Sequence, residues 1–188
     1  MTTGCQVLEP FAVAVAGVAG SGKSTLGRAV ARRLRAPLLD LDTLTNPLLD
    51  ALGAEVFDGH WLASRHAALV RRGRYAALLA TAAEVLGSAG RVVLVAPFTA
   101  ELAGGDAWRA LEAATRPATL RMVRLVGSPE LFAARRAGRG TVRDQHRPTG
   151  AEAGAAAVPV LDVDAEQPRD VQLEQVLRDL GVTRPDPR

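Results

Sequence analysis

Residues Gly17 to Thr25 combine the residue types that bind a phosphate group at the spacing this binding requires. The segment reads Gly-Val-Ala-Gly-Ser-Gly-Lys-Ser-Thr and fits G-x-x-x-x-G-K-[ST] with no mismatch. Its glycines permit positive φ and let the backbone approach an anion with no Cβ in the way. The amide N–H groups then face the phosphate from the start of a helix, whose dipole favours negative charge. The pattern predicts a phosphate-binding loop.

Individual side chains of this loop have predicted contacts. Lys23 would reach the β- and γ-phosphates, and the Ser24 hydroxyl would occupy one position on Mg²⁺. Lys23 is also the only lysine in the chain, and a lysine provides a compact point charge where an arginine provides a planar fork. The predicted nucleotide-binding residues of the loop are Gly17, Gly20, Ser21, Gly22, Lys23, Ser24 and Thr25.

The segments on either side of the loop have the patterns that the motif requires. Residues 11–16 form a short apolar run with β-branched members, which is typical of a buried parallel strand. After the loop, Leu26, Val30 and Leu34 recur at helical spacing on one face. The order strand, glycine loop, helix therefore predicts an α/β fold of the P-loop type.

The length and composition indicate one globular domain. The chain has 188 residues, 48 % of them hydrophobic, and we expect a single domain over 10–181 with a flexible N-terminus (1–9) and a disordered tail (182–188). The net charge is only +3 and the arginines are scattered, so nucleic acid is an unlikely partner. Cys5 is the only cysteine, which excludes an internal disulfide and a cysteine metal site. No apolar run approaches a membrane span, and we expect a cytoplasmic monomer or homodimer.

Two carboxylates follow the first predicted helix. Residues 36–42 read as a second strand that ends in Asp40-Leu41-Asp42, and strand alternation sends both carboxylates to the same side. Ligands of open parallel sheets sit at the carboxyl ends of the strands. One aspartate would help to hold Mg²⁺, and the other would accept the proton of an attacking hydroxyl. The alternative for Asp42 is a capping role at a helix that starts near Thr43.

Together, the glycine loop and the D-x-D at the second strand resemble the small P-loop kinases of the shikimate kinase and gluconate kinase group. These enzymes are relatives of the nucleoside monophosphate kinases and of AAA-type ATP-binding proteins. The resemblance implies a three-layer sandwich with a five-stranded parallel sheet, the cofactors ATP and Mg²⁺, and phosphoryl transfer to a small hydroxylated substrate. It places Asp40 on the magnesium side, with Ser24, and Asp42 on the substrate side.

The region after the D-x-D supplies candidate substrate contacts. Helical patterns cover 44–52, 61–73 and 75–86, with breaks expected at Gly53 and Gly73. The resemblance places Arg65 near a substrate carboxylate, although the arginines of 65–74 fit a solvated helix face equally well. The third strand, 91–96, lacks the acidic residue that ends this strand in many P-loop ATPases. Pro97 and Phe98 follow its carboxyl end and are expected to line the substrate pocket.

A glycine- and arginine-dense stretch, about 138–152, follows the predicted fourth strand (118–126) and the helix that begins at Ser128. By resemblance this stretch is a lid, whose arginines neutralise the charge on the transferring phosphoryl group. We expect Arg139 to be catalytic and Arg143 to contact the nucleotide; the alternative is a basic loop without a catalytic role. A fifth strand over 158–164 precedes Pro168, which either contacts adenine, as the resemblance implies, or simply starts a helix.

The leading hypothesis is therefore an ATP- and Mg²⁺-dependent kinase that phosphorylates a hydroxyl of a sugar acid, a nucleoside or nucleotide, or an antibiotic. Lys23, Asp40, Asp42 and Arg139 would be its catalytic residues. A nucleotide-binding protein that hydrolyses ATP slowly or regulates a partner is the first alternative, because of the missing acid after the third strand. A polynucleotide 5′-hydroxyl kinase is the second.

Overall fold

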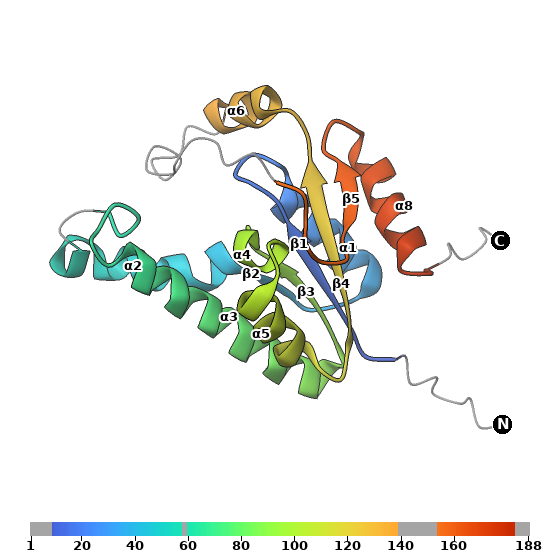
Figure 1. Cartoon of the computed structure of the whole chain (residues 1–188), viewed down its shortest axis with the longest axis horizontal. Helices are drawn as coiled ribbons and strands as arrows, with labels where there is room; N and C mark the ends of the chain where they lie inside the picture. Colours follow the sequence, from blue (N-terminus) through green and yellow to red (C-terminus); the bar gives the residue numbers. More distant parts are fainter. Residues whose placement is uncertain (1–8, 58–59, 139–153, 183–188) are drawn as a thin grey trace.

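The computed structural model describes residues 9–57, 60–138 and 154–182, and shows a five-stranded sheet in which every pair of neighbouring strands is parallel (Figure 1). The strand order is β2-β3-β1-β4-β5, so the strand before the glycine loop is the central one. The sheet confirms the predicted α/β class. Its strands are β1 (Phe11–Ala16), β2 (Leu38–Asp40), β3 (Arg91–Val95), β4 (Thr119–Val126) and β5 (Leu161–Asp164).

Helices cover both faces of the sheet, which gives the predicted three layers (Figure 1). On one face, Val13 and Val15 of β1 pack with residues of α1 (Lys23–Leu34) and α8 (Arg169–Asp179). On the other face, the alanines of β1 pack with α3 (Ala67–Ala89) and α5 (Gly105–Thr115). The alternation of valine and alanine along β1 thus separates two cores, because neighbouring side chains of a strand point to opposite faces.

Three further helices lie at the carboxyl edge of the sheet, where the strands end. They are α2 (Leu41–Phe57), α4 (Thr99–Leu102) and α6 (Pro129–Ala137). The predicted start of α6 is confirmed, since the Ser128 side chain accepts a hydrogen bond from the Leu131 N–H at 3.3 Å. The predicted break at Gly53 is also present, as a kink with φ +41° inside α2.

The predicted helix boundaries around Gly73 are wrong. The residues from Trp61 to His66 form turns, and α3 then runs without interruption from Ala67 to Ala89 through Gly73. A single glycine inside a helix costs about 1 kcal/mol relative to alanine, which is too little to end a helix that packs against the sheet. Because of its length, α3 extends beyond the carboxyl edge of the sheet and runs beside α2 (Figure 1).

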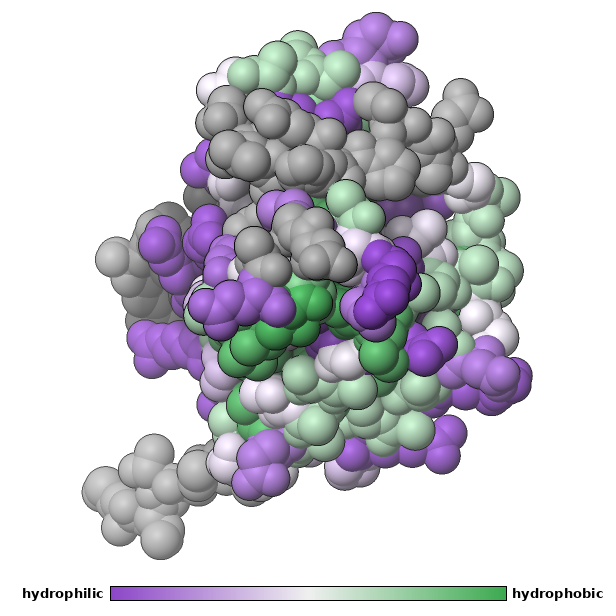
Figure 2. Space-filling view, turned by 90° about the vertical axis from the view of Figure 1, so that its left-hand side faces the viewer, coloured by the Kyte–Doolittle hydropathy of each residue, from purple (hydrophilic) through white to green (hydrophobic). Residues whose placement is uncertain are grey.

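The α2–α3 end of the molecule carries exposed apolar side chains. Of the four leucines in the predicted helix over 44–52, only Leu49 is buried. Leu44, Leu48 and Leu52 are exposed, as is Leu69 of α3. Figure 2 looks onto this side and shows apolar side chains gathered between polar ones. Among the helices of the described ranges, none has the length and apolar character needed to cross a membrane.

Candidate nucleotide and acceptor site

The glycine loop has the backbone that a phosphate cradle requires. Gly17, Gly20 and Gly22 have φ values of +151°, +91° and +94°, which lie in the region that favours glycine. Space is also limiting at Gly20, where an added Cβ would lie 2.4 Å from the carbonyl oxygen of Phe132. Gly22 is the N-cap of α1, and the N–H groups of Thr25 and Leu26 donate to its carbonyl at 2.9 and 3.0 Å. The loop therefore delivers its amides to the start of α1.

The polar side chains of the loop surround this cradle. Nζ of Lys23 donates to the carbonyl of Val18 at 3.4 Å, so the ammonium group lies back over the loop. Ser21 is buried, and its hydroxyl has no hydrogen-bond partner among the described residues. A buried polar atom without a partner is unfavourable by about 1–3 kcal/mol, and a bound oxyanion would supply an acceptor for it. These features fit a nucleotide phosphate.

Two arginines of α6 donate hydrogen bonds to the backbone of the glycine loop. Arg136 donates to the carbonyl of Ala19 at 2.9 Å, and Arg135 donates to the carbonyl of Ala165 at 2.9 Å and, over 3.4 Å, to that of Ser21. Both arginines belong to the helix predicted to begin at Ser128, and neither was predicted to have a role. Their position in the last turn of the helix that leads to the predicted lid was the available signal. Arg139 and Arg143, which we predicted to act in the lid, lie outside the described residues.

Asp40 ends β2 beside the glycine loop. It pairs with Val95 of β3, which in turn pairs with Val15 of β1 two residues before Gly17. Asp40 is 8 % exposed, and its Oδ1 accepts a hydrogen bond from the Asp42 N–H at 3.0 Å. The Asp40 side chain therefore binds a backbone N–H at the start of α2, a contact of the kind that the sequence predicted for Asp42 as its alternative role.

The predicted strand over 36–42 is too long, because β2 ends at Asp40 and Asp42 lies in the first turn of α2. The alternation of side chains along a strand therefore does not determine whether the two carboxylates lie on the same side. Asp42 instead pairs with Arg74 of α3 at 2.6 Å. The same guanidinium donates to Thr45 Oγ1 at 2.7 Å and Asn46 Oδ1 at 3.1 Å. It lies 4.7 Å from the centre of the Trp61 ring, a cation–π distance.

Arg74 was the residue that sequence reasoning missed, because it was grouped with the exposed arginines of 65–74. Arg65, the predicted substrate residue, is exposed in the turn before α3 and donates to His66 Nε2 at 3.0 Å. Arg74 lies within α3 and contacts α2, whereas Arg65 precedes α3. Spacing to the later core residue Leu78, four positions on, was the available signal for Arg74.

The two predicted pocket residues after β3, Pro97 and Phe98, differ in exposure. Pro97 is partly exposed at the carboxyl edge, and its predicted place in the wall of a substrate pocket stays a prediction. Phe98 is fully buried and packs edge-on against Tyr75, at a ring-centre distance of 6.1 Å. Its N–H donates to the Tyr75 hydroxyl at 3.1 Å. The structure therefore assigns the Phe98 side chain to the core and not to the surface of a substrate pocket.

Beside Tyr75 lies a buried carboxyl that the sequence analysis did not single out. Glu101 of α4 is 6 % exposed, and its Oε2 has no hydrogen-bond partner among the described residues. Burial raises the pKa of Glu101, and the Arg71 guanidinium lowers it to a smaller extent. Burial, followed by the Glu101 carboxylate, raises the pKa of Tyr75 to about 12. The centre of the Arg71 guanidinium lies 5.6 Å from that of the tyrosine ring.

The donor set at the loop suits Mg²⁺. Magnesium prefers hard oxygen ligands and uses one or two carboxylates together with substrate phosphates. Ser24, in the first turn of α1, offers a hydroxyl, and Asp40 offers a carboxylate whose single hydrogen bond within the described chain uses Oδ1. No group of three or more His, Cys, Asp and Glu side chains in the described ranges is arranged as a metal site of the protein alone.

Pro168, the predicted adenine contact, is the N-cap of α8 and is exposed. The predicted helix start is confirmed, and the adenine contact stays a prediction. The loop before it is ordered by Asp164, which accepts hydrogen bonds from the Glu166 N–H at 2.8 Å and from the Gln167 side chain at 3.2 Å.

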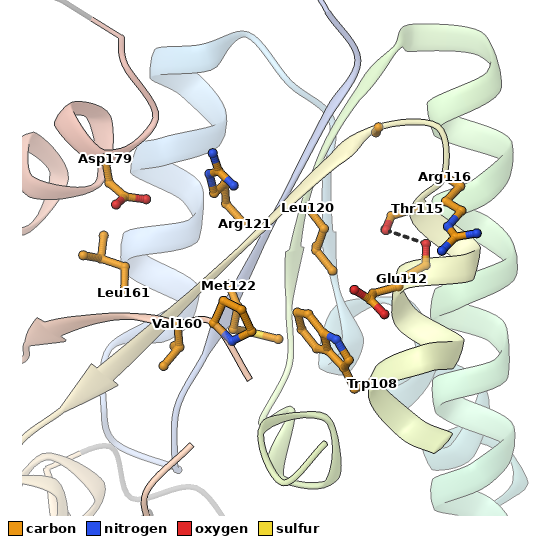
Figure 3. Close-up of a pocket in the computed structure, with 12 residues that line it drawn as sticks. Trp108, Glu112, Thr115, Arg116, Leu120, Arg121, Met122, Val160, Leu161 and Asp179 are labelled. Carbon is orange, nitrogen blue, oxygen red and sulfur yellow. Dashed lines mark hydrogen bonds between the residues drawn. The ribbon is translucent and has the colours of Figure 1, made fainter. Parts of the chain in front are cut away.

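A cavity of about 490 Å³ lies at the other end of the sheet (Figure 3). Its lining includes Leu120, Arg121 and Met122, which pair with Ala12, Val13 and Ala14 of β1, whereas the glycine loop follows the carboxyl end of that strand. Trp108 and Met122 contribute to its apolar part, and Arg121 and Asp179 lie at its edge (Figure 3). The cavity is therefore separate from the nucleotide site.

The parallel sheet order, the glycine loop and the carboxylate at the end of β2 together define a P-loop protein with the fold of the small P-loop kinases. The family model described as an AAA domain matches residues 13–158, so the chain belongs to that family. No match was found among the curated protein sequences.

Solved structures of three small kinases are similar to the chain. A gluconokinase from Sinorhizobium meliloti 1021 is 24 % identical, with 92 % of each chain covered and a TM-score of 0.60. The APS kinase CysC from Mycobacterium tuberculosis, solved with AMPPNP and APS, is 20 % identical, with 92 % of this chain and 98 % of that chain covered and a TM-score of 0.59. A shikimate kinase from Aquifex aeolicus vf5 is 17 % identical, with coverages of 91 % and 96 % and a TM-score of 0.57. At these identities the likeness shows the fold.

Proposed function

We propose that the protein transfers a phosphoryl group from ATP, with Mg²⁺, to a hydroxyl of a small molecule. The observation that carries this proposal is the position of Asp40 at the carboxyl end of β2, which β3 separates from β1 and its glycine loop. A phosphate cradle alone is common to all P-loop proteins. A carboxylate at the same edge of the sheet, two strands from the loop, adds a group that can bind the metal or accept a proton.

Within this proposal each residue of the site has a role. The amides of the glycine loop and Lys23 would hold the β- and γ-phosphates, while Ser24 and Asp40 would hold Mg²⁺. Magnesium-bound ATP supplies the phosphoryl group and neutralises part of the charge that develops during transfer. Arg135 and Arg136 fix the loop backbone through Ser21 and Ala19. Phosphoryl transfer is catalysed mainly by positioning and charge stabilisation, for which a rigid loop is required.

Asp42 would orient the acceptor, since its carboxylate is fixed by Arg74 at the start of α2. The proton of the attacking hydroxyl would pass to Asp40 or Asp42. Gluconokinase and shikimate kinase, the names of two of the similar structures, indicate that a protein with this fold can serve a sugar acid or a cyclic hydroxy acid.

A second function is favoured by a separate observation. No acidic residue stands directly at the end of β3, where Ala96 and Pro97 follow Val95, and one oxygen of Asp42 is bound to Arg74. A protein that binds ATP and hydrolyses it slowly, to regulate a partner, would tolerate this arrangement. We retain this candidate because it predicts ATP binding without acceptor-dependent turnover.

The test measures ADP release with ATP and Mg²⁺ across a library of hydroxylated metabolites, nucleosides and antibiotics. We expect acceptor-dependent ADP formation that is lost in Lys23→Ala and retained in Arg28→Ala, a change of an exposed cation on α1. ATP binding with no effect of any acceptor would reject the kinase and support the regulatory candidate. A mass increase of one phosphoryl group on the acceptor would identify the product.

A further inference from the structure

We infer that the acceptor is a neutral hydroxylated molecule, such as a free sugar, a sugar alcohol or a nucleoside, and that Glu101 helps to select it against anionic analogues. The inference rests on the proposed phosphoryl transfer and concerns only the acceptor. It differs from the expectation, implied by the resemblance, that Arg65 lies near a substrate carboxylate.

The first observation is that the arginine of α3 that faces α2 is already engaged. Arg74 donates to Asp42, Thr45 and Asn46, and it is only 10 % exposed as a side chain. A substrate carboxylate would have to compete with the carboxylate of Asp42, which is held at 2.6 Å. Arg74 therefore fixes the wall of the site and does not offer a cation to the substrate.

The second observation concerns the remaining arginines of this region. Arg71 lies over the ring of Tyr75 and acts electrostatically on Glu101. Arg65 precedes α3 and donates to His66, and Arg72 is exposed one position away from Arg71. None of these arginines forms an ion pair or hydrogen bond that directs it toward Asp40 or Asp42 within the described part of the chain.

The third observation is the number of carboxylates at the carboxyl edge. Asp40 ends β2, Asp42 lies in the first turn of α2, and Glu101 lies in the short helix that follows β3. The strands β2 and β3 are direct neighbours in the sheet. Arg74 neutralises Asp42, whereas Asp40 and Glu101 have no ion pair within the described residues, so these two carboxylates would repel an anionic acceptor but not a neutral polyol.

Glu101 adds a specific requirement to this charge distribution. Its Oε2 is buried and has no donor within the described residues. A hydroxyl group can donate a hydrogen bond to a carboxylate oxygen, but a carboxylate or phosphate dianion has no proton to donate. The unpartnered oxygen therefore matches the hydroxyl groups of a neutral acceptor and disfavours an anion at the same place.

The experiment compares acceptors that differ only in charge. The pairs are D-glucitol with D-gluconate, methyl shikimate with shikimate, and adenosine with AMP, together with a matched pair built on any acceptor that the library screen yields. Steady-state ADP release is measured with saturating ATP and Mg²⁺. We expect kcat/KM to be at least about tenfold higher for the neutral member of an active pair, as one hydrogen bond to a charged group allows.

The outcomes separate the inference from the proposed function. Turnover that favours the anionic member would overturn the neutral-acceptor inference and leave the kinase in place. If no acceptor stimulates ADP release, the kinase itself is rejected and this inference falls with it. The comparison uses the wild-type protein, so it does not depend on the folding of a variant.

The part played by Glu101 is tested by Glu101→Gln, which keeps the size of the side chain and removes its negative charge. We expect the ratio of anionic to neutral kcat/KM to rise about tenfold, through KM of the acceptor, with KM of ATP unchanged. Glu112→Gln, on α5 and away from the glycine loop, should leave the ratio unchanged. An unaltered ratio in Glu101→Gln would exclude Glu101 as a selecting residue, since a merely structural role would not change it.

Discussion

The guanidinium of Arg74 donates to Oδ1 of Asp42 over 2.6 Å and so ties the first turn of α2 to α3. The second carboxylate of the D-x-D is therefore oriented by a residue 32 positions further along the chain. Asn46 and Thr45 accept from the same guanidinium, which makes the contact a small network across the two helices. In the proposed kinase, the acceptor side of the site would depend on this network for its shape.

Arg74→Ala should lower the free energy of unfolding by about 2–3 kcal/mol, because three partly or fully buried acceptors lose their donor. Urea unfolding followed by circular dichroism measures this loss. Arg72→Ala, an exposed change two residues away on α3, should stay within about 0.5 kcal/mol of the wild type. Equal stabilities of the two variants would show that the network contributes nothing measurable.

Glycine-to-alanine changes should have opposite signs at two positions. Gly20→Ala forces a side chain into φ +91° and within 2.4 Å of a backbone oxygen, and should lower the melting temperature and weaken ATP binding. Gly73→Ala has open space in the middle of α3 and should stabilise the protein by about 0.5–1 kcal/mol. Thermal unfolding checks both, and a stabilising Gly20→Ala would refute the strained geometry of the loop.

Arg136→Ala should weaken ATP binding about tenfold, because the carbonyl of Ala19 loses its donor at 2.9 Å and the loop loses a fixed support. Equilibrium titration with a fluorescent ATP analogue measures the affinity without requiring turnover. Arg32→Ala, an exposed cation in the last turn of α1, serves as the control. An unchanged affinity in Arg136→Ala would show that the loop keeps its conformation without this contact.

The stability of the protein should depend on the ionisation of Glu101. Burial raises its pKa above the ordinary value of 4.5, so the folded state binds the proton more tightly than the unfolded state. Stability from this group is fully present below pH 4.5 and is lost as the pH rises through the folded-state pKa. Each unit of the raised pKa corresponds to about 1.4 kcal/mol. Urea unfolding at pH 5 and pH 7 should show a smaller decline in Glu101→Gln than in the wild type.

An ion pair between two strands gives a further prediction. Arg124, 7 % exposed, binds both carboxylate oxygens of Asp162 at 2.6 and 2.7 Å and donates to the Gly154 carbonyl. This contact joins β4 to β5 beside the start of the last described segment. Asp162→Ala leaves the buried Arg124 guanidinium without its counter-charge, but the Asp162 side chain is 44 % exposed and solvent screens the pair, so we expect a cost of about 1–2 kcal/mol, measured by urea unfolding. Asp106→Ala, an exposed change on α5, should have little effect.

Local patterns were sufficient to predict much of the fold. The glycine loop, its flanking strand and helix, and the five-stranded sheet depend on motif spacing and apolar periodicity, which are properties of short segments. The cap at Ser128 was predictable for the same reason, since it involves residues three positions apart. The nucleotide side of the site lies within one such segment, apart from the two supporting arginines.

The acceptor side could not be predicted in the same way, because its contacts join distant segments. Arg74 with Asp42 and Tyr75 with Phe98 connect residues 32 and 23 positions apart. The sequence pattern of 65–74 also did not show that Arg74 is nearly buried while Arg65 is exposed. Phe98 was expected to line the substrate pocket because it follows a strand end, but its side chain is buried and packs against Tyr75 in the core.

The single lysine gives this chain an unusual chemical property. Apart from the N-terminal amine, the only primary amine of the protein is Nζ of Lys23, which lies over the glycine loop within 3.4 Å of the Val18 carbonyl. An amine-specific acylating reagent therefore has one side-chain target in the whole molecule, and that target lies in the nucleotide site. The unmodified wild-type protein thus carries its own built-in reporter of nucleotide occupancy, which mass spectrometry can follow as one protected adduct.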